Sequence, residues 1–240
     1  MPLGVSIVIP ALNEGALIAQ AVQRAWRLGP REVIVADGGS SDGTADSARS
    51  AGAQVCSSPP GRARQQSAGA QHASGEFLLF LHADAWLAED GLRQIERAAA
   101  ENQAHCGAFR QQIEADGLLY RWLERGNAWR VRLRGLPYGD QGIFVRRSLF
   151  EEVGGFPDVR LLEDVLLMKA LRRRVWPALL PGPLHVNARR WQRHGVIRQT
   201  IRNWMLLSAA RAGVPPERLA RFYALHFPLD KLRSPDEGGS

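Results

Sequence analysis

The first part of the chain alternates short apolar runs with longer segments of helical periodicity, and this alternation limits the possible folds more than any other feature. The runs that read as strands are "VSIVIP" at 5–10, "EVIVAD" at 32–37, "AQVCS" at 53–57 and "EFLLFLHAD" at 76–84. Strand, helix and strand at this spacing predict right-handed βαβ units. We therefore expect an α/β fold with a Rossmann-like, mostly parallel central sheet flanked by helices.

The second part of the chain is less regular. We expect a strand at 106–115, an arginine-rich helix at 117–135, a glycine turn entering a strand at 139–147, and a helix at 161–174. Two amphipathic helices are expected at 196–228, followed by a disordered tail at 229–240. The chain has 240 residues, which suits one core, so we expect a single domain over 1–228.

Composition narrows the class of protein. The formal net charge is +7, and nearly all basic residues are arginine, whose rigid fork suits contact with phosphates. The charge is scattered and no nucleic-acid reader motif occurs, so nucleic acid is not an expected partner. Cys56 and Cys106 are expected to be buried, reduced thiols. The start "MPLGVSIVIP" lacks the features of a signal peptide, and no apolar run could span a bilayer, so we expect a cytoplasmic protein.

Polar, glycine-rich segments follow three of the expected strands: "PALNEG", "DGGSSDGT" and "HADAW". Ligands of parallel α/β sheets bind beyond the carboxyl ends of the strands. Asp37 ends one strand and is a candidate to accept hydrogen bonds from a base or ribose, whereas Asp42 is expected to cap the next helix. The dinucleotide fingerprint and the P-loop pattern are both absent, which argues against nicotinamide dehydrogenases and P-loop enzymes.

Two further groups could contact a phosphate or a metal. Arg62 and Arg64 precede a helix rich in small residues and could reach phosphates from the rim of the sheet. His82 and Asp84 lie two apart in "LHADAW", so they would point to the same side if this stretch ended a strand. A carboxylate at this position could hold a metal ion, and so could the imidazole.

Four strings in order resemble the inverting family 2 glycosyltransferases of the GT-A fold: "SIVIPALNEG", "VIVADGGSSDGT", "GRARQQSAGAQHASGEFLLFLHAD" and "LLEDVLL". The resemblance covers roughly residues 4 to 191. "LHAD" and "YGDQGIFVRR" also resemble a small bacterial subgroup, the selenodomain-associated or arsenosugar-biosynthesis glycosyltransferases. The resemblance implies a nucleotide-sugar-binding half at 1–115 and an acceptor-binding half at 116–195.

The resemblance also implies roles for single residues. Asp37 resembles the aspartate that contacts the donor base, and His82 would lie near the ribose or the metal. Asp84 resembles the last acid of the DxD motif, which binds Mn²⁺ or Mg²⁺ on the donor diphosphate. Asp164 resembles the catalytic base. The loop that contains Pro10, Ala11 and Glu14 resembles the first donor-nucleotide loop of the family.

The chemistry accounts for these residue types. Cleavage of a sugar–diphosphate bond develops negative charge that a divalent cation and arginines stabilise. Mg²⁺ often uses one or two carboxylates together with phosphate oxygens and water, so one acid can suffice. Inversion also needs a base on the opposite face of the sugar. We expect Asp164 to be this base and Glu163 to orient substrate or pair with an arginine.

The remaining candidates lie in two short strings. Asp140 and Gln141 in "YGDQG" are expected to form hydrogen bonds near the donor sugar or the acceptor. Arg190 and Trp191 in "NARRW" are expected to cover the diphosphate or stack on the acceptor. His185 and His194 are expected to be structural or solvated rather than metal ligands.

The donor is expected to be a UDP- or GDP-sugar, and the acceptor is an unknown hydroxyl compound. One alternative is a polyisoprenyl-phosphate glycosyltransferase at the membrane surface, with peripheral membrane contact through basic helices. Another is a non-catalytic nucleotide-binding relative, because the DxD motif is altered. Trp122 and Trp129 are expected to pack in the core, the alternatives being an acceptor groove or a membrane surface.

Overall fold

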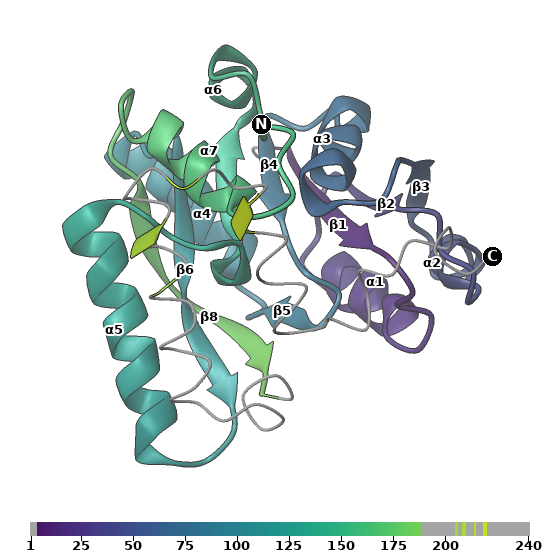
Figure 1. Cartoon of the computed structure of the whole chain (residues 1–240), viewed down its shortest axis with the longest axis horizontal. Helices are drawn as coiled ribbons and strands as arrows, with labels where there is room; N and C mark the ends of the chain where they lie inside the picture. Colours follow the sequence, from purple (N-terminus) through teal and green to yellow (C-terminus); the bar gives the residue numbers. More distant parts are fainter. Residues whose placement is uncertain (1–3, 189–204, 206–207, 210–213, 215–217, 220–240) are drawn as a thin grey trace.

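The structure is a computed structural model that describes residues 4–188, 205, 208–209, 214 and 218–219. Its described part is built around an 8-stranded sheet in the order β3-β2-β1-β4-β7-β6-β8-β5 (Figure 1). The strands are β1 (Val5–Ala11), β2 (Glu32–Asp37), β3 (Gln54–Ser57), β4 (Phe77–Phe80), β5 (Ala85–Leu87), β6 (Cys106–Glu114), β7 (Ile143–Arg146) and β8 (Ala178–Asn187).

Helices connect these strands and cover the sheet. They are α1 (Ile18–Arg27), α2 (Thr44–Ser50), α3 (Arg62–His72), α4 (Gly91–Asn102), α5 (Leu118–Arg134), α6 (Arg147–Glu152) and α7 (Glu163–Leu171), together with the 3₁₀ turn η1 (Gly139–Gln141). Strands β1, β2, β3 and β4 form a parallel half, as the alternation of apolar runs predicts. The α/β fold with a mostly parallel sheet flanked by helices is confirmed.

The other half of the sheet is mixed. β7 runs antiparallel to both β4 and β6, β8 runs parallel to β6, and β5 runs antiparallel to β8. Phe80 at the end of β4 pairs with Ile143 at the start of β7. Because β7 is antiparallel, the η1 turn that precedes it lies at the same edge as the carboxyl ends of β1, β2 and β4.

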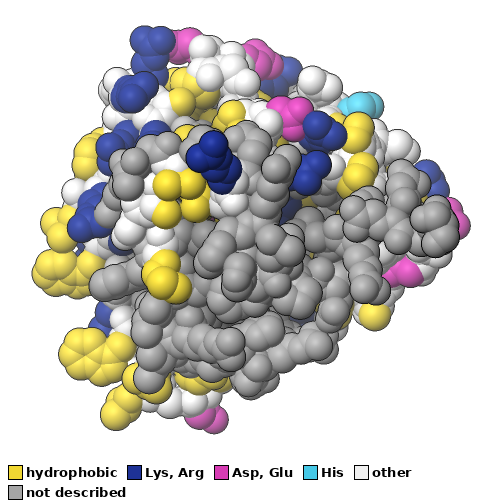
Figure 2. Space-filling model, in the orientation of Figure 1, with side chains coloured by type: hydrophobic (Ala, Val, Ile, Leu, Met, Phe, Trp, Pro, Cys, Tyr) yellow, Lys and Arg dark blue, Asp and Glu magenta, His cyan; other side chains and the backbone are white. Residues whose placement is uncertain are grey.

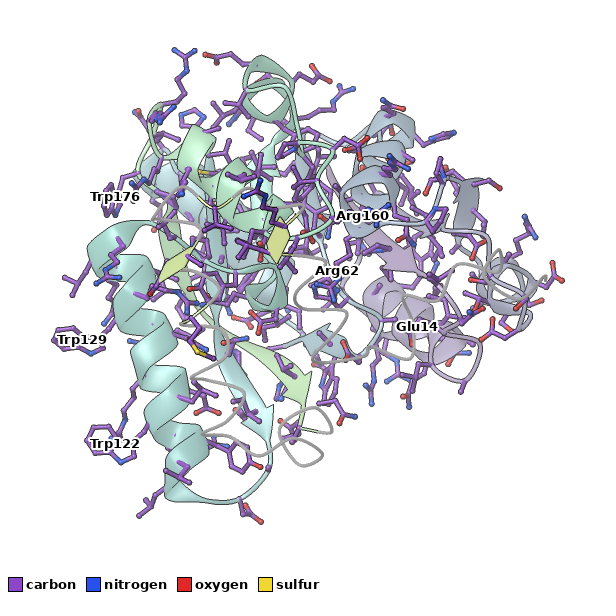
Figure 3. All side chains as sticks on the ribbon, in the orientation of Figure 1. Glu14, Arg62, Trp122, Trp129, Arg160 and Trp176 are labelled. Carbon is purple, nitrogen blue, oxygen red and sulfur yellow. The ribbon has the colours of Figure 1, made fainter. Side chains whose placement is uncertain are left out.

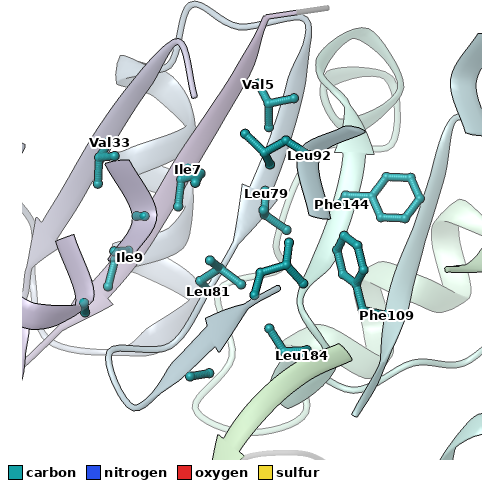
Figure 4. Packing of buried hydrophobic residues seen from close by; sticks show 14 of the residues in the cluster. Val5, Ile7, Ile9, Val33, Leu79, Leu81, Leu92, Phe109, Phe144 and Leu184 are labelled. Atoms are coloured by element: carbon teal, nitrogen blue, oxygen red, sulfur yellow. The ribbon is translucent and has the colours of Figure 1, made fainter. Parts of the chain in front are cut away.

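Both faces of the parallel half are buried, which explains the nearly continuous apolar runs. Ile7 and Ile9 of β1 point to one face, where they pack with Val33 and Leu79 (Figure 4). Val8, between them, points to the other face and packs in a second cluster that includes residues of α3, α6 and α7. Both cysteines are buried and free, as expected.

The strand expected at 76–84 is shorter than predicted. β4 ends at Phe80, and residues 81–84 form a turn in which the N–H of Ala85 donates to the carbonyl oxygen of His82. His82 and Asp84 are therefore placed by a turn, not by strand alternation. The apolar run continues past the strand because Leu81 is still buried in the core.

The expected core packing of Trp122 and Trp129 is wrong. Their exposed fractions are 68% and 63%, because α5 covers the sheet with Ala128 and Val131 and turns its indoles outward. A helix at the margin of a sheet buries one face only. Of the expected C-terminal helices and tail, most residues lie outside the described part of the chain. Among the described residues, no helix has the length and apolar character that crossing a bilayer requires.

Candidate active site

The ends of β1 and β2 are tied together by one buried side chain. Gln65 of α3 donates through Nε2 to the carbonyl oxygens of Ala11, at 2.6 Å, and Ala36, at 3.2 Å. The N–H of Gly38 also donates to the carbonyl oxygen of Ala11 at 2.9 Å. This arrangement fixes the carboxyl edge of both strands next to the start of α3.

Asp37 lies at this edge and is buried. Its Oδ2 accepts hydrogen bonds from the N–H groups of Gly39 and Ser40, both at 3.1 Å. Its Oδ1 is also buried but has no hydrogen-bond partner among the described residues. A buried carboxylate oxygen without a partner is costly, so Asp37 is prepared to accept a hydrogen bond from a ligand.

The loops after β1 and β2 hold each other through side chains. The N–H of Asn13 donates to Oγ of Ser40 at 2.9 Å, and the N–H of Glu14 donates to Oγ1 of Thr44 at 2.8 Å. Asp42 accepts from the N–H of Gly15 at 2.9 Å and from Thr44, so it joins the two loops. The N-cap of α2 is Gly43, so the expected capping by Asp42 is wrong: Asp42 lies one residue before the cap and binds the N–H of Thr44, the first residue of the helix. The structure therefore places Pro10, Ala11 and Glu14 beside the loop of Asp37.

The helix α3 brings arginines to the same edge. It packs very close to β1 at Gly69, where a Cβ atom would lie 2.4 Å from Cγ1 of Val8. In Figure 3 the labelled side chain of Arg62 extends from the start of α3 toward the middle of the view. Arg64 is exposed and forms a two-bond ion pair with Asp158, at 2.8 and 3.1 Å.

Two acids at the start of α7 form the second part of the site. Leu162, the N-cap of this helix, has a left-handed φ of 66°, which is strained for a bulky residue. This turn directs Glu163 into the protein, where it is only 5% exposed. Burial and the neighbouring Asp164 carboxylate raise the pKa of Glu163 to about 7, against the opposing effect of the Arg62 charge.

Asp164 is held by backbone donors. Oδ2 accepts from the N–H of Gly139 at 2.5 Å, and Oδ1 accepts from the N–H of Val165 at 2.7 Å. Burial raises the pKa of Asp164, while these two hydrogen bonds and the Arg62 charge oppose the increase. A carboxylate with a raised pKa and fixed orientation is suited to accepting a proton.

Gly139 brings His82 and Asp164 together. A Cβ atom on Gly139 would lie 3.3 Å from Oδ2 of Asp164 and 3.4 Å from Nε2 of His82. The turn after β4, the η1 turn and the start of α7 therefore meet at one point of the carboxyl edge. His82 lies closer to the acid pair than the sequence indicated.

A family model described as glycosyl transferase family 2 matches residues 6–154, which is more than half of the chain. The chain belongs to glycosyl transferase family 2. The matched range holds the donor edge and the η1 turn. A search of curated proteins found no match.

Solved structures confirm the GT-A fold. S. aureus TarS 1-349 in complex with UDP-GlcNAc is similar, with a TM-score of 0.60 and 17% identity. That match covers 78% of this chain and 59% of TarS 1-349, so this chain spans less than two thirds of its length. Glucosyl-3-phosphoglycerate synthase from Mycobacterium tuberculosis, with Mn²⁺, UDP-glucose and phosphoglyceric acid, gives a TM-score of 0.58 at 21% identity, covering 89% of this chain and 81% of that one. The same enzyme was also solved with Mg²⁺ and UDP.

Asp84 is the candidate metal ligand at this edge. It is partly buried in the turn after β4, and its carboxylate makes no hydrogen bond to another described residue. The described part of the chain contains no group of three or more His, Cys, Asp and Glu residues arranged to hold a metal. One carboxylate fits a divalent cation that takes its other ligands from a diphosphate and water.

A polar network behind the η1 turn was not predicted from the sequence. Arg130 of α5 lies over the ring of Tyr138 and donates to Oε1 of Gln141 at 2.5 Å and Oδ1 of Asn127 at 2.9 Å. Gln111 of β6 donates to the carbonyl oxygen of Asp140 and accepts from Asn127. Polar residues on the inner face of α5 were the available signal. This network fixes the turn that carries Gly139.

The network occupies one of the polar atoms that the "YGDQG" residues were expected to offer to a ligand. Oε1 of Gln141 is occupied by Arg130 and by the N–H of Tyr138, whereas its Nε2 is buried without a partner among the described residues. Oδ1 of Asp140 is likewise buried without a partner there. Gln141 is 0% exposed, so its side chain supports the η1 turn from inside the protein.

His185 is not part of this cluster. His185 bonds through Nδ1 to Glu114 at 2.8 Å and stacks on Trp86, as expected for a structural histidine. Arg190, Trp191 and His194 lie outside the described residues. Their expected roles stay predictions.

Proposed function

We propose that the protein transfers a hexosyl group from a nucleotide-diphosphate sugar to an acceptor hydroxyl, with inversion at the anomeric carbon and Asp164 as general base. The observation that carries the proposal is the meeting of Asp164, Gly139 and His82 at the same sheet edge as Asp37. A carboxylate suited to proton transfer thus shares an edge with a carboxylate suited to binding a base or ribose.

The reaction balances on these groups. The acceptor oxygen attacks the anomeric carbon from the side of Asp164, which takes the hydroxyl proton. The bond between this carbon and the diphosphate oxygen breaks with its electron pair, and the nucleoside diphosphate leaves. The positive charge of Arg62 acts to lower the pKa values of Glu163 and Asp164, so Arg62 is near both acids and would stabilise the leaving diphosphate.

On the donor side, Oδ1 of Asp37 would accept a hydrogen bond from the base, and the loop of Pro10, Ala11 and Glu14 would line the nucleotide. Arg64 would contact a phosphate only by exchanging its partner Asp158. The complexes of TarS with UDP-GlcNAc and of the synthase with UDP-glucose support a UDP-sugar, with a GDP-sugar as the alternative.

Asp84 would hold the divalent cation, Mn²⁺ or Mg²⁺, with which the synthase was solved. When bound there, the cation would neutralise charge on the diphosphate. His82 would bind the nucleotide or the cation. In this proposal residues 1–115 form the donor half, residues 116–195 form the acceptor half, and the protein works in the cytoplasm.

Two classes of acceptor are compatible with the proposal. Asp140 and Gln141 would position the acceptor, with Arg190 and Trp191 as further candidates. The first candidate is an unidentified hydroxyl compound, which is compatible with the resemblance to the selenodomain-associated or arsenosugar-biosynthesis subgroup. The second candidate is a polyisoprenyl phosphate, favoured by the exposed indoles of Trp122 and Trp129.

A thermal-shift screen with UDP- and GDP-sugars, each with Mn²⁺ or Mg²⁺, tests the donor, because a bound ligand raises the unfolding temperature by mass action. We expect one UDP-sugar to give the largest shift. NMR of the product anomer, or of the sugar released by slow hydrolysis, then tests inversion. Donor binding without hydrolysis or transfer across the panel would favour a non-catalytic nucleotide-binding relative.

A further inference from the structure

The outer face of α5 carries large apolar side chains that are exposed to solvent. Leu118, Trp122 and Trp129 recur at helical spacing, and Leu119 and Leu133 flank them. We call these five residues the α5 outer face. In Figure 2 apolar and basic side chains gather at the left margin, where Figure 1 places α5, and in Figure 3 the indoles of Trp122 and Trp129 point away from the helix. A contiguous exposed apolar face marks an interaction site.

The charged residues on the outer side of α5 itself are positive, whereas the exposed Asp116 lies just before the helix. Arg125 and Arg132 lie on this side of the helix, are exposed, and form no ion pair or hydrogen bond with another described residue. Glu124 is the one acidic residue between 118 and 134. It faces inward, where its Oε1 accepts from the N–H of Ile113 at 2.6 Å and pairs with Arg121 at 3.0 Å. The face therefore offers indoles and leucines with uncompensated positive charge.

We infer that the α5 outer face docks the protein on the surface of a bilayer that contains anionic lipid. Interfacial helices combine Trp and Leu on the buried side with arginines that reach the headgroups. Indoles suit the boundary between hydrocarbon and water because one end is apolar and the N–H is polar. Each free arginine adds attraction to anionic headgroups.

Other occupants fit this face less well. A second copy bound about a two-fold axis would bring Arg125 and Arg132 against the same residues of its partner. Residues 189–240 contain more basic than acidic residues, so they do not complement the face in charge. Single-stranded nucleic acid stacks on aromatic rings along a groove, whereas this face is the convex side of a helix with leucines between the rings.

Docking would orient the candidate active site. The inner side of α5 supplies Asn127 and Arg130 to the network that fixes the η1 turn. The η1 turn is therefore held by the side of α5 that does not carry the docked face. The inference does not depend on sugar transfer, because the face and its charge stand without it.

Co-sedimentation of the full chain with lipid vesicles tests the inference. We expect binding to vesicles of phosphatidylcholine with phosphatidylglycerol as the minor component, weak binding to phosphatidylcholine alone, and loss of binding at high salt. The double variant Trp122→Ser and Trp129→Ser should lower the partition coefficient about tenfold or more. Because both side chains are exposed, the unfolding temperature should stay within about 2 °C.

Matched controls separate the face from general charge and hydrophobicity. Trp26→Ser and Arg27→Glu on α1 should leave vesicle binding unchanged, whereas Arg125→Glu should weaken it. Brominated lipid should quench tryptophan fluorescence in the wild type and much less in the double variant. Equal sedimentation of wild type and double variant would overturn the inference. So would a dimer that the double variant abolishes, or oligonucleotide binding lost in that variant without any vesicle binding.

Discussion

The two parts of the candidate active site are built differently. At the donor edge, Asp37 is held by N–H groups two and three residues further along the chain, and neighbouring loops complete the structure. In the acid cluster, Asp164 is held by Gly139, which lies 25 residues away and is itself fixed by Arg130 of α5. The carboxylate of the donor edge is held by nearby N–H groups and is suited to binding. The acid cluster instead joins distant elements around carboxylates with raised pKa values. The comparison predicts that changes at the donor edge alter affinity and that changes in the acid cluster alter rate.

The largest expected effect is on rate. Asp164→Asn removes the proton acceptor but keeps the shape, so kcat should fall by about 10²–10⁴ while the Kd for the donor stays within about twofold. Turnover assays and calorimetric titration of the donor check this. Asp46→Asn, which removes an exposed acid from α2, is the charge-matched control and should behave as wild type. Near-normal turnover of the Asp164→Asn variant would show that Asp164 is not the general base.

The matching change at the donor edge is Asp37→Asn. An amide oxygen can still accept from Gly39 and Ser40, but the charged acceptor offered by Oδ1 is lost. Loss of a charge-assisted hydrogen bond costs about 1.5–3 kcal/mol, so the donor Kd should rise by about 10- to 100-fold. At saturating donor, kcat should change little. A variant with normal affinity and reduced kcat would reverse the comparison.

Glu163→Gln probes the raised pKa values of the acid cluster. The pKa of Glu163 is about 7 in the folded protein and ordinary in the unfolded chain, so ionisation opposes folding. Stability contributed by the protonated acid is fully present below about pH 4.5 and is lost as the pH rises through 7. The variant should therefore be more stable than wild type at pH 8 by about 1–3 kcal/mol, with a smaller difference at pH 5. Urea unfolding at both pH values measures it; a variant less stable than wild type at pH 8 would contradict the assignment.

The same contrast explains what could be predicted from the sequence. The parallel half of the sheet follows from the apolar runs, and the position of Asp37 follows from a motif at the end of a strand whose N–H groups bind it within three positions. The acid cluster depends on the left-handed turn at Leu162 and on the network of Arg130, which no local pattern announces. Trp122 and Trp129 were misassigned because helical spacing shows that residues share a face, not whether that face is covered.

The smallest expected effect comes from Gly139→Ala, which tests how closely the acid cluster is fitted. The added Cβ would lie 3.3 Å from Oδ2 of Asp164 and 3.4 Å from Nε2 of His82, so both side chains must shift by a few tenths of an ångström. Since a misplacement of 1 Å costs up to about 10²-fold in rate, this shift should lower kcat by about 3- to 10-fold.

Stability separates this effect from damage to the fold. Gly139 is not among the glycines with positive φ, so alanine strains no backbone there, and the free energy of unfolding should change by less than about 1 kcal/mol. Gly126→Ala is the matched control, because a Cβ on that residue of α5 meets nothing within 4 Å. It should keep kcat and gain stability from helix propensity. Equal kcat values for both variants would mean that the space between His82 and Asp164 is not where the reaction occurs, and the acid cluster would lose its catalytic role.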